Sequence, residues 1–170
     1  MTPARDGQAE FLDLIYQYQG ILVKISTIYA HGAVEANDLI QDMLIQLWQS
    51  YPTFKGQSSF STWMYRIALN TALMYRRKYA RRPEGHIDPN PPPEFMTYQP
   101  ELDEDVQLLY ECIRELPSLD RAIILLYLEQ YRYQEIADIT GLSHSNVSVR
   151  IVRIKSKLKT LLTAKGYCEE

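Results

Sequence analysis

A proline-rich segment in the middle of the chain limits the folds open to it more than any other feature. Residues 83–100, PEGHIDPNPPPEFMTYQP, contain six of the nine prolines in this chain of 170 residues. Proline lacks a backbone N–H and fixes φ, so such a run blocks helix and sheet and favours extended, polyproline-like backbone. The sequence therefore predicts a semi-rigid linker here, with one folded part before it and another after it.

Both flanking parts carry the periodicity of helices. Their apolar residues recur about every 3.6 positions, and the alternation typical of strands is scarce. With 46% hydrophobic and 23% charged residues, a chain of this length can bury one core or two small ones. We predict an all-α protein with two small helical domains, residues 1–82 and 101–170, joined by the linker.

Three helices are predicted in the first part. A long amphipathic helix ends at HGAV (31–34), a second follows, and a third begins near Ser59 after SYPTFKGQSS. The residues expected to face inward are Phe11, Leu14, Ile15, Tyr18, Ile21, Leu22, Ile25 and Ile28, then Leu39, Ile40, Met43, Leu44 and Leu47, then Phe60, Trp63, Met64, Ile67, Thr71 and Met74.

Polar residues of the second helix are predicted to point away from its apolar stripe. These are Asp38, Gln41 and Asp42. For the two carboxylates, a solvated surface and a contact with another protein are both open. A catalytic carboxylate pair is disfavoured, because no other acid, base or nucleophile is placed to join them.

A basic surface is predicted on the third helix and just beyond it. Arg66, Asn70 and Arg77 share one helical face, and RRKYARR, which begins with Arg76 and Arg77, carries five positive charges in seven residues. Such a cluster is suited to the phosphates of a nucleic acid.

The second part is predicted to end in a helix-turn-helix. Two helices cover ELDEDVQLLYECIREL and PSLDRAIILLYLEQY, and two more surround a tight turn at Gly141, with Ser143 or Ser145 as the cap of the last helix. The buried stripe of this last helix is expected to be Val147, Ile151, Ile154 and Leu158.

The opposite side of the last helix suits a DNA major groove. Small and apolar residues would meet base edges while cations on both flanks meet phosphates. A solvated face usually mixes Glu with Lys, yet residues 139–167 contain no carboxylate. The alternative for Val149 is that it packs against the preceding helix and reads nothing. The centre comprises Ser145, Val149 and Val152, one flank Asn146, Arg150, Arg153 and Lys157, and the other Ser148, Lys155 and Lys159.

Charge distribution favours nucleic acid although the formal net charge is −3. The two basic clusters, residues 76–82 and 150–165, hold 11 of the 18 Lys and Arg residues, whereas residues 101–138 contain ten carboxylates against three arginines. The local surface charge therefore matters more than the net charge.

Membrane, redox and metal functions are not indicated. There is no apolar run long enough for a membrane span and no signal peptide, so a cytoplasmic protein is expected. The two cysteines, Cys112 and Cys168, do not suggest a disulfide framework, and the three histidines lack the spacing of metal ligands. We expect no cofactor and no structural metal.

Three segments together resemble the extracytoplasmic-function (group IV) sigma factors of the sigma-70 family. ANDLIQDMLIQLW resembles their polymerase-binding helix, FSTWMYRIALNTALMYRRK their promoter-melting and minus-ten helix, and LPSLDRAIILLYLEQYRYQEIADITGLSHSNVSVRIVRIKSKL their minus-thirty-five domain. The order and spacing of all three make the resemblance specific, and it leaves out only the linker and the termini.

The resemblance implies a sigma factor, not an enzyme, that binds core RNA polymerase and directs initiation at promoters with minus-ten and minus-thirty-five elements. Asp38, Gln41 and Asp42 would face the clamp of the largest subunit, and the polymerase flap and an anti-sigma factor are further implied partners. Leu39, Trp48 and Trp63 would be structural. The residues implied at the minus-ten element are Lys55, Gln57 and Ser58 in the loop from Pro52 to Ser59, with Arg66, Asn70, Arg76 and Arg77; those at the minus-thirty-five element are Ser145, Asn146, Ser148, Val149, Arg150, Arg153 and Lys157.

The chain departs from the family pattern at several of these places. Asn37 replaces an acid, Met74 replaces a frequent Asp, and Ser148 and Val149 stand where basic and small residues are common. The preferred promoter sequence therefore does not transfer from relatives.

Two other functions compete with this interpretation. A repressor or activator would use the helix-turn-helix alone and would need a dimer for two half-sites, which leaves the first domain unexplained. An enzyme acting on nucleic acid would need a phosphate loop, a metal cluster or an activated nucleophile, and the sequence has none of these motifs.

Overall fold

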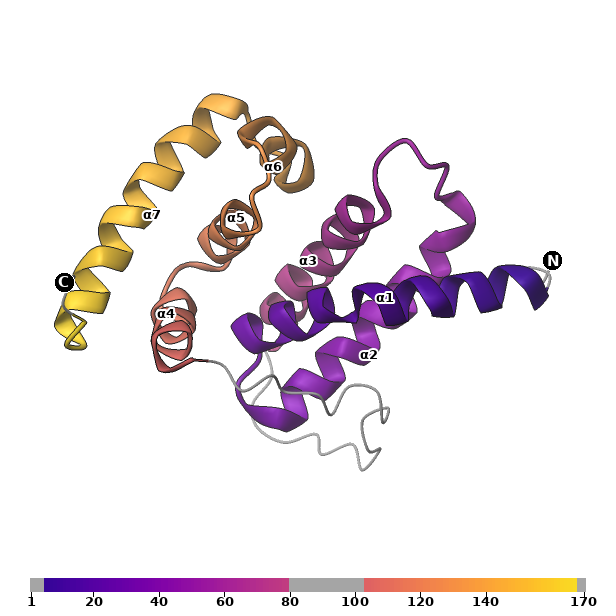
Figure 1. Cartoon of the computed structure of the whole chain (residues 1–170), viewed down its shortest axis with the longest axis horizontal. Helices are drawn as coiled ribbons and strands as arrows, with labels where there is room; N and C mark the ends of the chain where they lie inside the picture. The colour runs from indigo at the N-terminus through magenta and orange to yellow at the C-terminus, as the bar shows by residue number, and fades with distance from the viewer. Residues whose placement is uncertain (1–4, 80–102, 168–170) are drawn as a thin grey trace. The chain divides into compact units, whose positions relative to one another are not determined.

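The computed structural model describes residues 5–79 and 103–167, and all the regular elements in these ranges are helices (Figure 1). The chain divides into two compact units, Met1–Pro100 and Glu101–Glu170. The all-α fold with two units is confirmed. The predicted linker at 83–100 lies outside the described residues, so its conformation and boundaries stay predictions.

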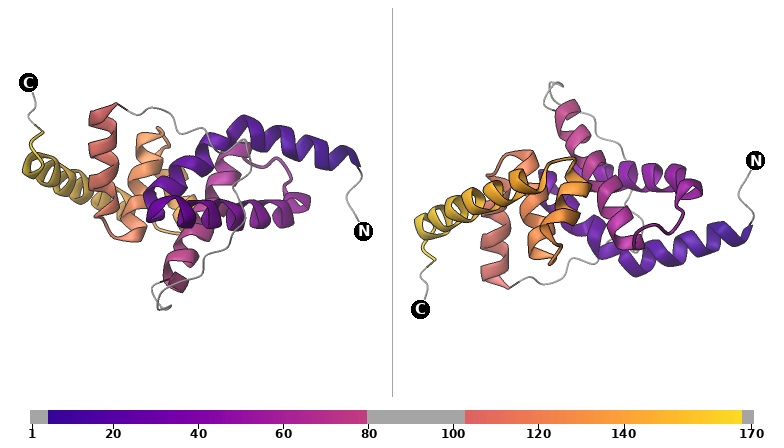
Figure 2. Two further views of the ribbon diagram at one scale, coloured as in Figure 1. Left: turned by 90° about the horizontal axis from the view of Figure 1, so that it is seen from below. Right: turned by 90° about the horizontal axis from the view of Figure 1, so that it is seen from above.

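The first unit is built from three helices that pack against one another in every pairing (Figures 1 and 2). The break between the first two helices is shorter than the predicted segment HGAV (31–34), because α2 already begins at Gly32. The Glu35 carboxylate accepts a hydrogen bond from the His31 N–H (2.7 Å), which caps α2 early. The elements are α1 (Arg5–Tyr29), α2 (Gly32–Ser50), the 3₁₀ turn η1 (Tyr51–Thr53) and α3 (Phe60–Tyr79).

Most of the inward positions predicted for α1 and α2 are confirmed. Leu14, Tyr18 and Leu44 are only half-buried, because they lie at the edges of their stripes. The confirmed buried positions are Phe11, Ile15, Ile21, Leu22, Ile25 and Ile28 on α1 and Leu39, Ile40, Met43 and Leu47 on α2.

The inner face predicted for α3 is wrong over most of its length. Trp63, Ile67 and Thr71 are only half-buried, and Met74 is 68% exposed. Helix α3 packs against both α1 and α2, so two neighbours determine which of its sides is covered. That side includes small residues, which the apolar periodicity did not weigh. The buried residues of α3 are Phe60, Met64, Tyr65, Ala68, Leu69, Ala72 and Tyr75.

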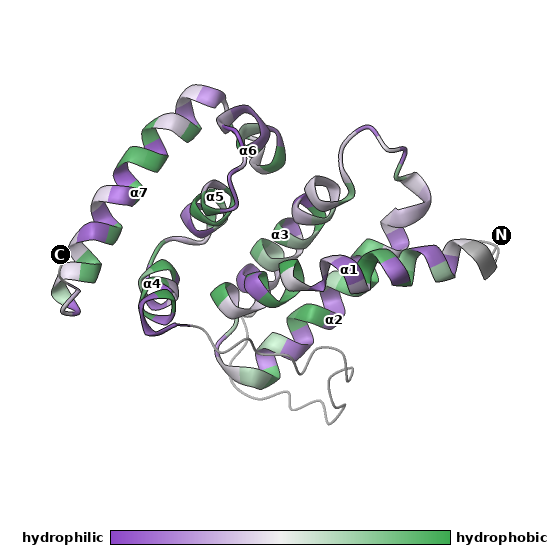
Figure 3. Ribbon diagram, viewed as in Figure 1, coloured by the Kyte–Doolittle hydropathy of each residue, from purple (hydrophilic) through white to green (hydrophobic). Residues whose placement is uncertain are grey.

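The second unit consists of four helices, and its last helix has the predicted buried stripe. Val147, Ile151, Ile154 and Leu158 are all buried, and Figure 3 shows apolar positions recurring along α7 between polar ones. The helices are α4 (Glu104–Arg114), α5 (Ser118–Leu128), α6 (Tyr133–Thr140) and α7 (His144–Ala164).

The turn between α6 and α7 is the predicted helix-turn-helix. Gly141 has φ +73°, the left-handed conformation that favours glycine, and its N–H donates to the Ala137 carbonyl (2.9 Å). Ser143, rather than Ser145, caps α7, because its hydroxyl accepts from the Asn146 N–H (3.2 Å). None of the helices described is long and apolar enough to cross a membrane.

Candidate nucleic-acid and protein interfaces

The outward face of α2 is a mixed acidic and apolar strip. Asp42 is exposed as predicted, whereas Asp38 and Gln41, which were also predicted to face outward, are half-buried. Val34 and Ile45 are exposed on the same face, one turn before and one turn after the carboxylates. We call these five residues the α2 strip. Its apolar ends and charged middle can combine contact area with electrostatic selection of a basic partner.

Val34 and Ile45 were missed by the sequence analysis. The prediction considered only the polar residues of α2. The helical spacing of Val34 and Ile45 from Asp38 and Asp42 nevertheless indicates that they share one face.

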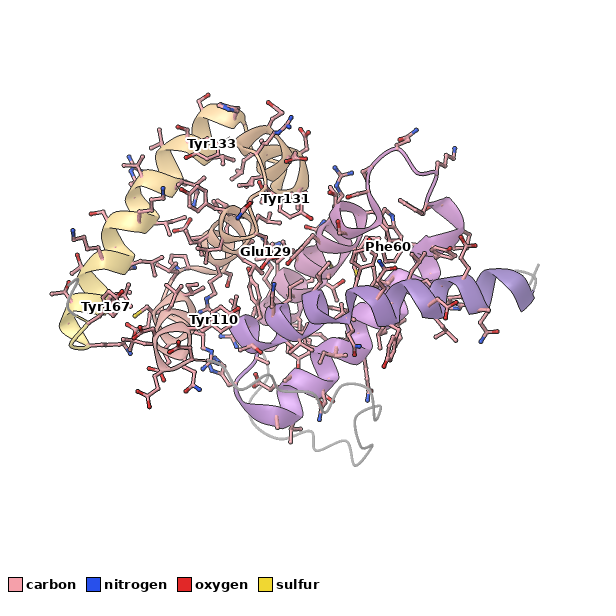
Figure 4. All side chains as sticks on the ribbon, viewed as in Figure 1. Phe60, Tyr110, Glu129, Tyr131, Tyr133 and Tyr167 are labelled. Atoms are coloured by element: carbon pink, nitrogen blue, oxygen red, sulfur yellow. The ribbon has the colours of Figure 1, made fainter. Side chains whose placement is uncertain are left out.

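Stacked aromatic rings hold the loop that leads into α3. The Phe54 ring lies 5.0 Å from Trp63 and 5.8 Å from Phe60, measured between centroids, and Tyr51 lies 6.3 Å from Trp63. Phe60 is labelled where α3 begins in Figure 4. The structural role expected for Trp63 has this physical basis, since edge and tilted ring pairs are favourable.

The tip of this loop is exposed between two fixed ends. Gly56 takes the left-handed conformation at φ +68°, and Lys55, Gln57 and Ser58 are exposed around it. Ser59 ends the loop by accepting a hydrogen bond from the Thr62 N–H (3.2 Å), which caps α3. Because both of its ends are fixed, the loop can expose its polar side chains while it keeps its conformation.

The predicted minus-ten residues on α3 form one long exposed face rather than one compact site. Arg66, Asn70 and Arg77 are exposed, and Arg76 is half-buried at the edge of this face. At 1.5 Å of rise per residue, the two ends of the face are roughly 15 Å apart. Met74 lies on it between Asn70 and Arg77. Nothing on this face is a carboxylate, since residues 43–83 contain no Asp or Glu.

The centre of the exposed α7 face is apolar. Val149 is 49% exposed and Val152 is 67% exposed, so both present apolar surface on this face. The sequence predicts Val152 at the centre of this face but not among the residues that contact the minus-thirty-five element. Its exposure makes it available next to Val149, three residues earlier on the helix. Ser145, Asn146, Arg153 and Lys157 are exposed as predicted, whereas Ser148 is half-buried.

Two cations of α7, the half-buried Arg150 and the exposed Lys155, contact side chains of α5. Arg150 donates through Nη1 to Asp120 Oδ1 (2.7 Å) in a partly buried ion pair. Lys155 donates to the Tyr127 hydroxyl and lies 4.1 Å from the centre of that ring. The hydrogen bond to Tyr127 raises the pKa of Lys155. Asp120 and Tyr127 thus contact two edges of α7 and reinforce the rotation that its buried stripe sets.

An aromatic row supports the start of α7. Tyr133, labelled in Figure 4, lies 6.3 Å from Tyr127 and 5.8 Å from His144, the first residue of α7. His144 therefore has a packing role here. No group of His, Cys, Asp or Glu side chains in the described ranges could hold a metal ion.

The chain matches two family models that together span most of its length. Sigma-70 region 2 matches residues 14–82, and Sigma-70, region 4 matches residues 106–158. The ECF RNA polymerase sigma-E factor of Haemophilus influenzae is 30% identical over 88% of this chain and 87% of the relative. The RNA polymerase sigma-H factor of Pseudomonas aeruginosa is 28% identical over 93% of this chain and 89% of the relative.

Two solved structures share the fold. The sigma factor RpoE of Bartonella quintana, solved with the anti-sigma factor NepR, has a TM-score of 0.67 at 20% identity and covers 94% of this chain and 98% of its own. CnrH, solved with the cytosolic domain of CnrY, has a TM-score of 0.65 at 24% identity and covers 92% of this chain and 90% of its own.

Proposed function

Since the chain belongs to the extracytoplasmic-function sigma factors of the sigma-70 family, which bind core RNA polymerase and direct promoter-specific initiation, we propose how its surfaces divide this work. The α2 strip binds the polymerase. The loop before α3 and the exposed face of α3 read the minus-ten element. The exposed face of α7 reads the minus-thirty-five element.

The observation that carries the DNA assignment is the position of the carboxylate-free segments. Residues 43–83 and 139–167 lack Asp and Glu, and they include α3 and α7. Each helix exposes a face on which cations surround a few neutral side chains, an arrangement suited to phosphates with bases between them. The alternative of a regulator acting without polymerase is disfavoured, because both sigma regions match.

On α2, the carboxylates Asp38 and Asp42 attract a basic partner surface, for which we propose the clamp of the largest polymerase subunit. Val34 and Ile45 add apolar contact at the two ends of the strip. Helix α2 keeps its inner stripe fully within the unit, so this outward contact does not disturb the fold. The second unit would contact the polymerase flap.

A charge reversal tests the α2 assignment. Asp38→Arg combined with Asp42→Arg should abolish co-purification with core polymerase, since two new cations would face a basic partner. Asp13→Arg combined with Gln17→Arg, on exposed positions of α1, is the control and should retain binding. Circular dichroism checks that both proteins stay helical. Retained binding by the α2 variant would contradict the assignment.

On the DNA side, the side chains divide into phosphate contacts and base readers. Arg77 and Lys157 are assigned to phosphates, whereas Asn70, Val149 and Arg153 are assigned to bases. Lys55, Gln57 and Ser58 would surround a base that leaves the duplex at the loop. Arg150 has a positioning role, because its guanidinium already binds Asp120.

Selection of promoters from a randomised library, with core polymerase and each variant, tests this division. Lys157→Ala should lower occupancy on all sequences alike and reduce its salt dependence. Val149→Ser should relax the preference at one base pair without other change, because it removes an apolar contact of the kind made with a thymine methyl. Identical selected sequences from wild type and Val149→Ser would contradict a reading role.

Regulation follows from the relatives only as a proposal. One solved structure pairs the sigma factor RpoE with the anti-sigma factor NepR, and the other pairs CnrH with the cytosolic domain of CnrY. We propose that an anti-sigma factor masks the surfaces above. We also propose a cytoplasmic, non-catalytic protein, since the work of a sigma factor is binding. A pull-down of the wild-type chain from the native host tests for such a regulator, which should co-purify in a complex that lacks polymerase because both bind the same surfaces.

A further inference from the structure

Met74 is a large apolar side chain in an exposed and otherwise polar setting. It is 68% exposed, more than any other apolar residue of α3. Its neighbours one turn away along the same face are Asn70 and Lys78, both exposed, and Arg77 lies beside it. Within residues 5–79, Met74 lies outside the core, because the buried side of α3 is the opposite one.

The surroundings of Met74 indicate what covers it. An apolar patch for another protein usually has several contiguous apolar residues, whereas Met74 is a single one among cations and an amide. The segment around it, residues 43–83, contains no carboxylate. The positive charge of this segment therefore suits a polyanionic partner. The Met74 thioether would then contact an apolar part of that partner. In a nucleic acid, the apolar elements are the thymine methyl groups and the faces of the bases, and the base faces become accessible where a step is opened.

We propose that Met74 is an apolar wedge that contacts the face of a base at an opened step of the minus-ten element. Methionine is one of the side chains that proteins insert between base steps, where they replace part of the lost stacking. Arg77 and Lys78 hold the adjoining phosphates, and Asn70 contacts a base edge on the other side. This proposal rests on the assignment of α3 to the minus-ten element.

Opening of the promoter is the step that the wedge should assist. A wedge lowers the cost of the unstacked state, which a duplex must reach and a pre-melted template already occupies. Loss of the wedge should therefore slow opening of a duplex promoter and leave a pre-melted template of the same sequence unaffected. A residue that only stabilised the fold or the contact with polymerase would change both templates alike.

The experiment measures permanganate reactivity of minus-ten thymines over time with core polymerase plus the full chain. Met74→Ala should slow opening of duplex promoter about tenfold, with unchanged reactivity on the pre-melted template. Met74→Leu should largely restore the rate, since it restores an apolar side chain of similar volume. Leu12→Ala, at a 54% exposed position on α1, is the control and should behave as wild type.

The outcomes separate this proposal from the assignment on which it rests. Asn70→Ala and Arg77→Ala are measured in parallel. If these two impair opening and Met74→Ala does not, the wedge is overturned while the assignment of α3 stands. If all three variants open the duplex normally, the assignment itself fails and the wedge with it. An equal defect of Met74→Ala on both templates also overturns the wedge.

Discussion

The loop before α3 and the helix α7 are both proposed to meet DNA, but the side chains next to their exposed parts are supported by different kinds of contact. Phe54 stacks on Phe60 and Trp63, so apolar rings support the loop. Helix α7 packs its apolar stripe into the core of its unit, and polar contacts with α5 add to this packing at its edges, namely the Arg150–Asp120 ion pair and the bond from Lys155 to Tyr127.

This difference explains what each element can do. Ring packing involves no net charge, so salt does not screen it, and it can anchor a loop whose exposed tip adapts to an extruded base. Ion pairs and hydrogen bonds depend on geometry, so they fix the rotation of a helix that has to align side chains with base edges. Two cations of α7 therefore position the helix, while Arg153 and Lys157 stay exposed to bind DNA.

The largest effect is expected from removing the ring at the loop. Phe54→Ala should lower the free energy of unfolding of the first unit by about 2 kcal/mol, roughly half the cost for a fully buried Phe, because Phe54 is half-buried. Both tryptophans, Trp48 and Trp63, lie in this unit, so their fluorescence in urea reports on it alone.

Salt is the control for this first prediction. Repeating the measurement in 1 M NaCl should leave the Phe54→Ala difference unchanged, since no charge is involved. A difference that shrinks at high salt would break the proposed contrast between apolar and polar support.

A smaller effect is expected from the ion pair of the second unit. A double-mutant cycle of Asp120→Ala and Arg150→Ala should give a coupling of about 1 kcal/mol at low salt, because the pair is partly buried. The coupling should fall in 1 M NaCl. Additive effects of the two changes would show that the pair does not hold α7.

Alkylation of Cys112 provides the measurement for this unit, in a Cys168→Ser background. Cys112 is fully buried, and burial is the main cause of its raised pKa, so the thiol should react only after opening of the fold. The protection against alkylation then gives the free energy of opening for each variant of the cycle.

The two units also differ in how much the sequence could predict. The buried stripe of α7 is correct at all four positions, because the other helices of its unit cover one side of it and leave a clean 3.6-residue pattern. Helix α3 is covered by two neighbours, and its buried side includes Ala68 and Ala72, so the larger apolar residues suggested the wrong face. Met74 is the clearest example, because it was predicted to face inward and is 68% exposed.

The candidate site was predictable where it depends on local spacing. The exposed positions of Asp42, Asn70 and Arg153 follow from helical period alone. The engagement of Arg150 does not, because its partner Asp120 is 30 residues away and on another helix. Tertiary pairing of this kind requires the packing of α5 against α7, which no local pattern contains.

The smallest effect concerns the turn that precedes α6. Gln130 has φ +64°, the conformation that Gly141 adopts at φ +73° on the other side of α6. The left-handed conformation costs a residue with a side chain about 1–2 kcal/mol, whereas glycine costs about 0.5–1 kcal/mol through the entropy of the unfolded chain. Gln130→Gly should therefore stabilise the second unit by roughly 0.5 kcal/mol, measured by protection of Cys112 from alkylation.

Gly141→Ala is the matched reverse change, and it completes this last prediction. An added Cβ at Gly141 would meet no other atom within 4 Å, so the loss of stability should come from backbone conformation alone and should be about 1 kcal/mol. We expect Gln130→Gly to raise and Gly141→Ala to lower the free energy of opening, while both variants bind DNA as wild type does. That result would mean that the two turns contribute stability, whereas the contacts from α5 help to orient α7. If Gln130→Gly instead lowers protection, the glutamine side chain stabilises the turn, and strain at residue 130 is not the weak point of this unit.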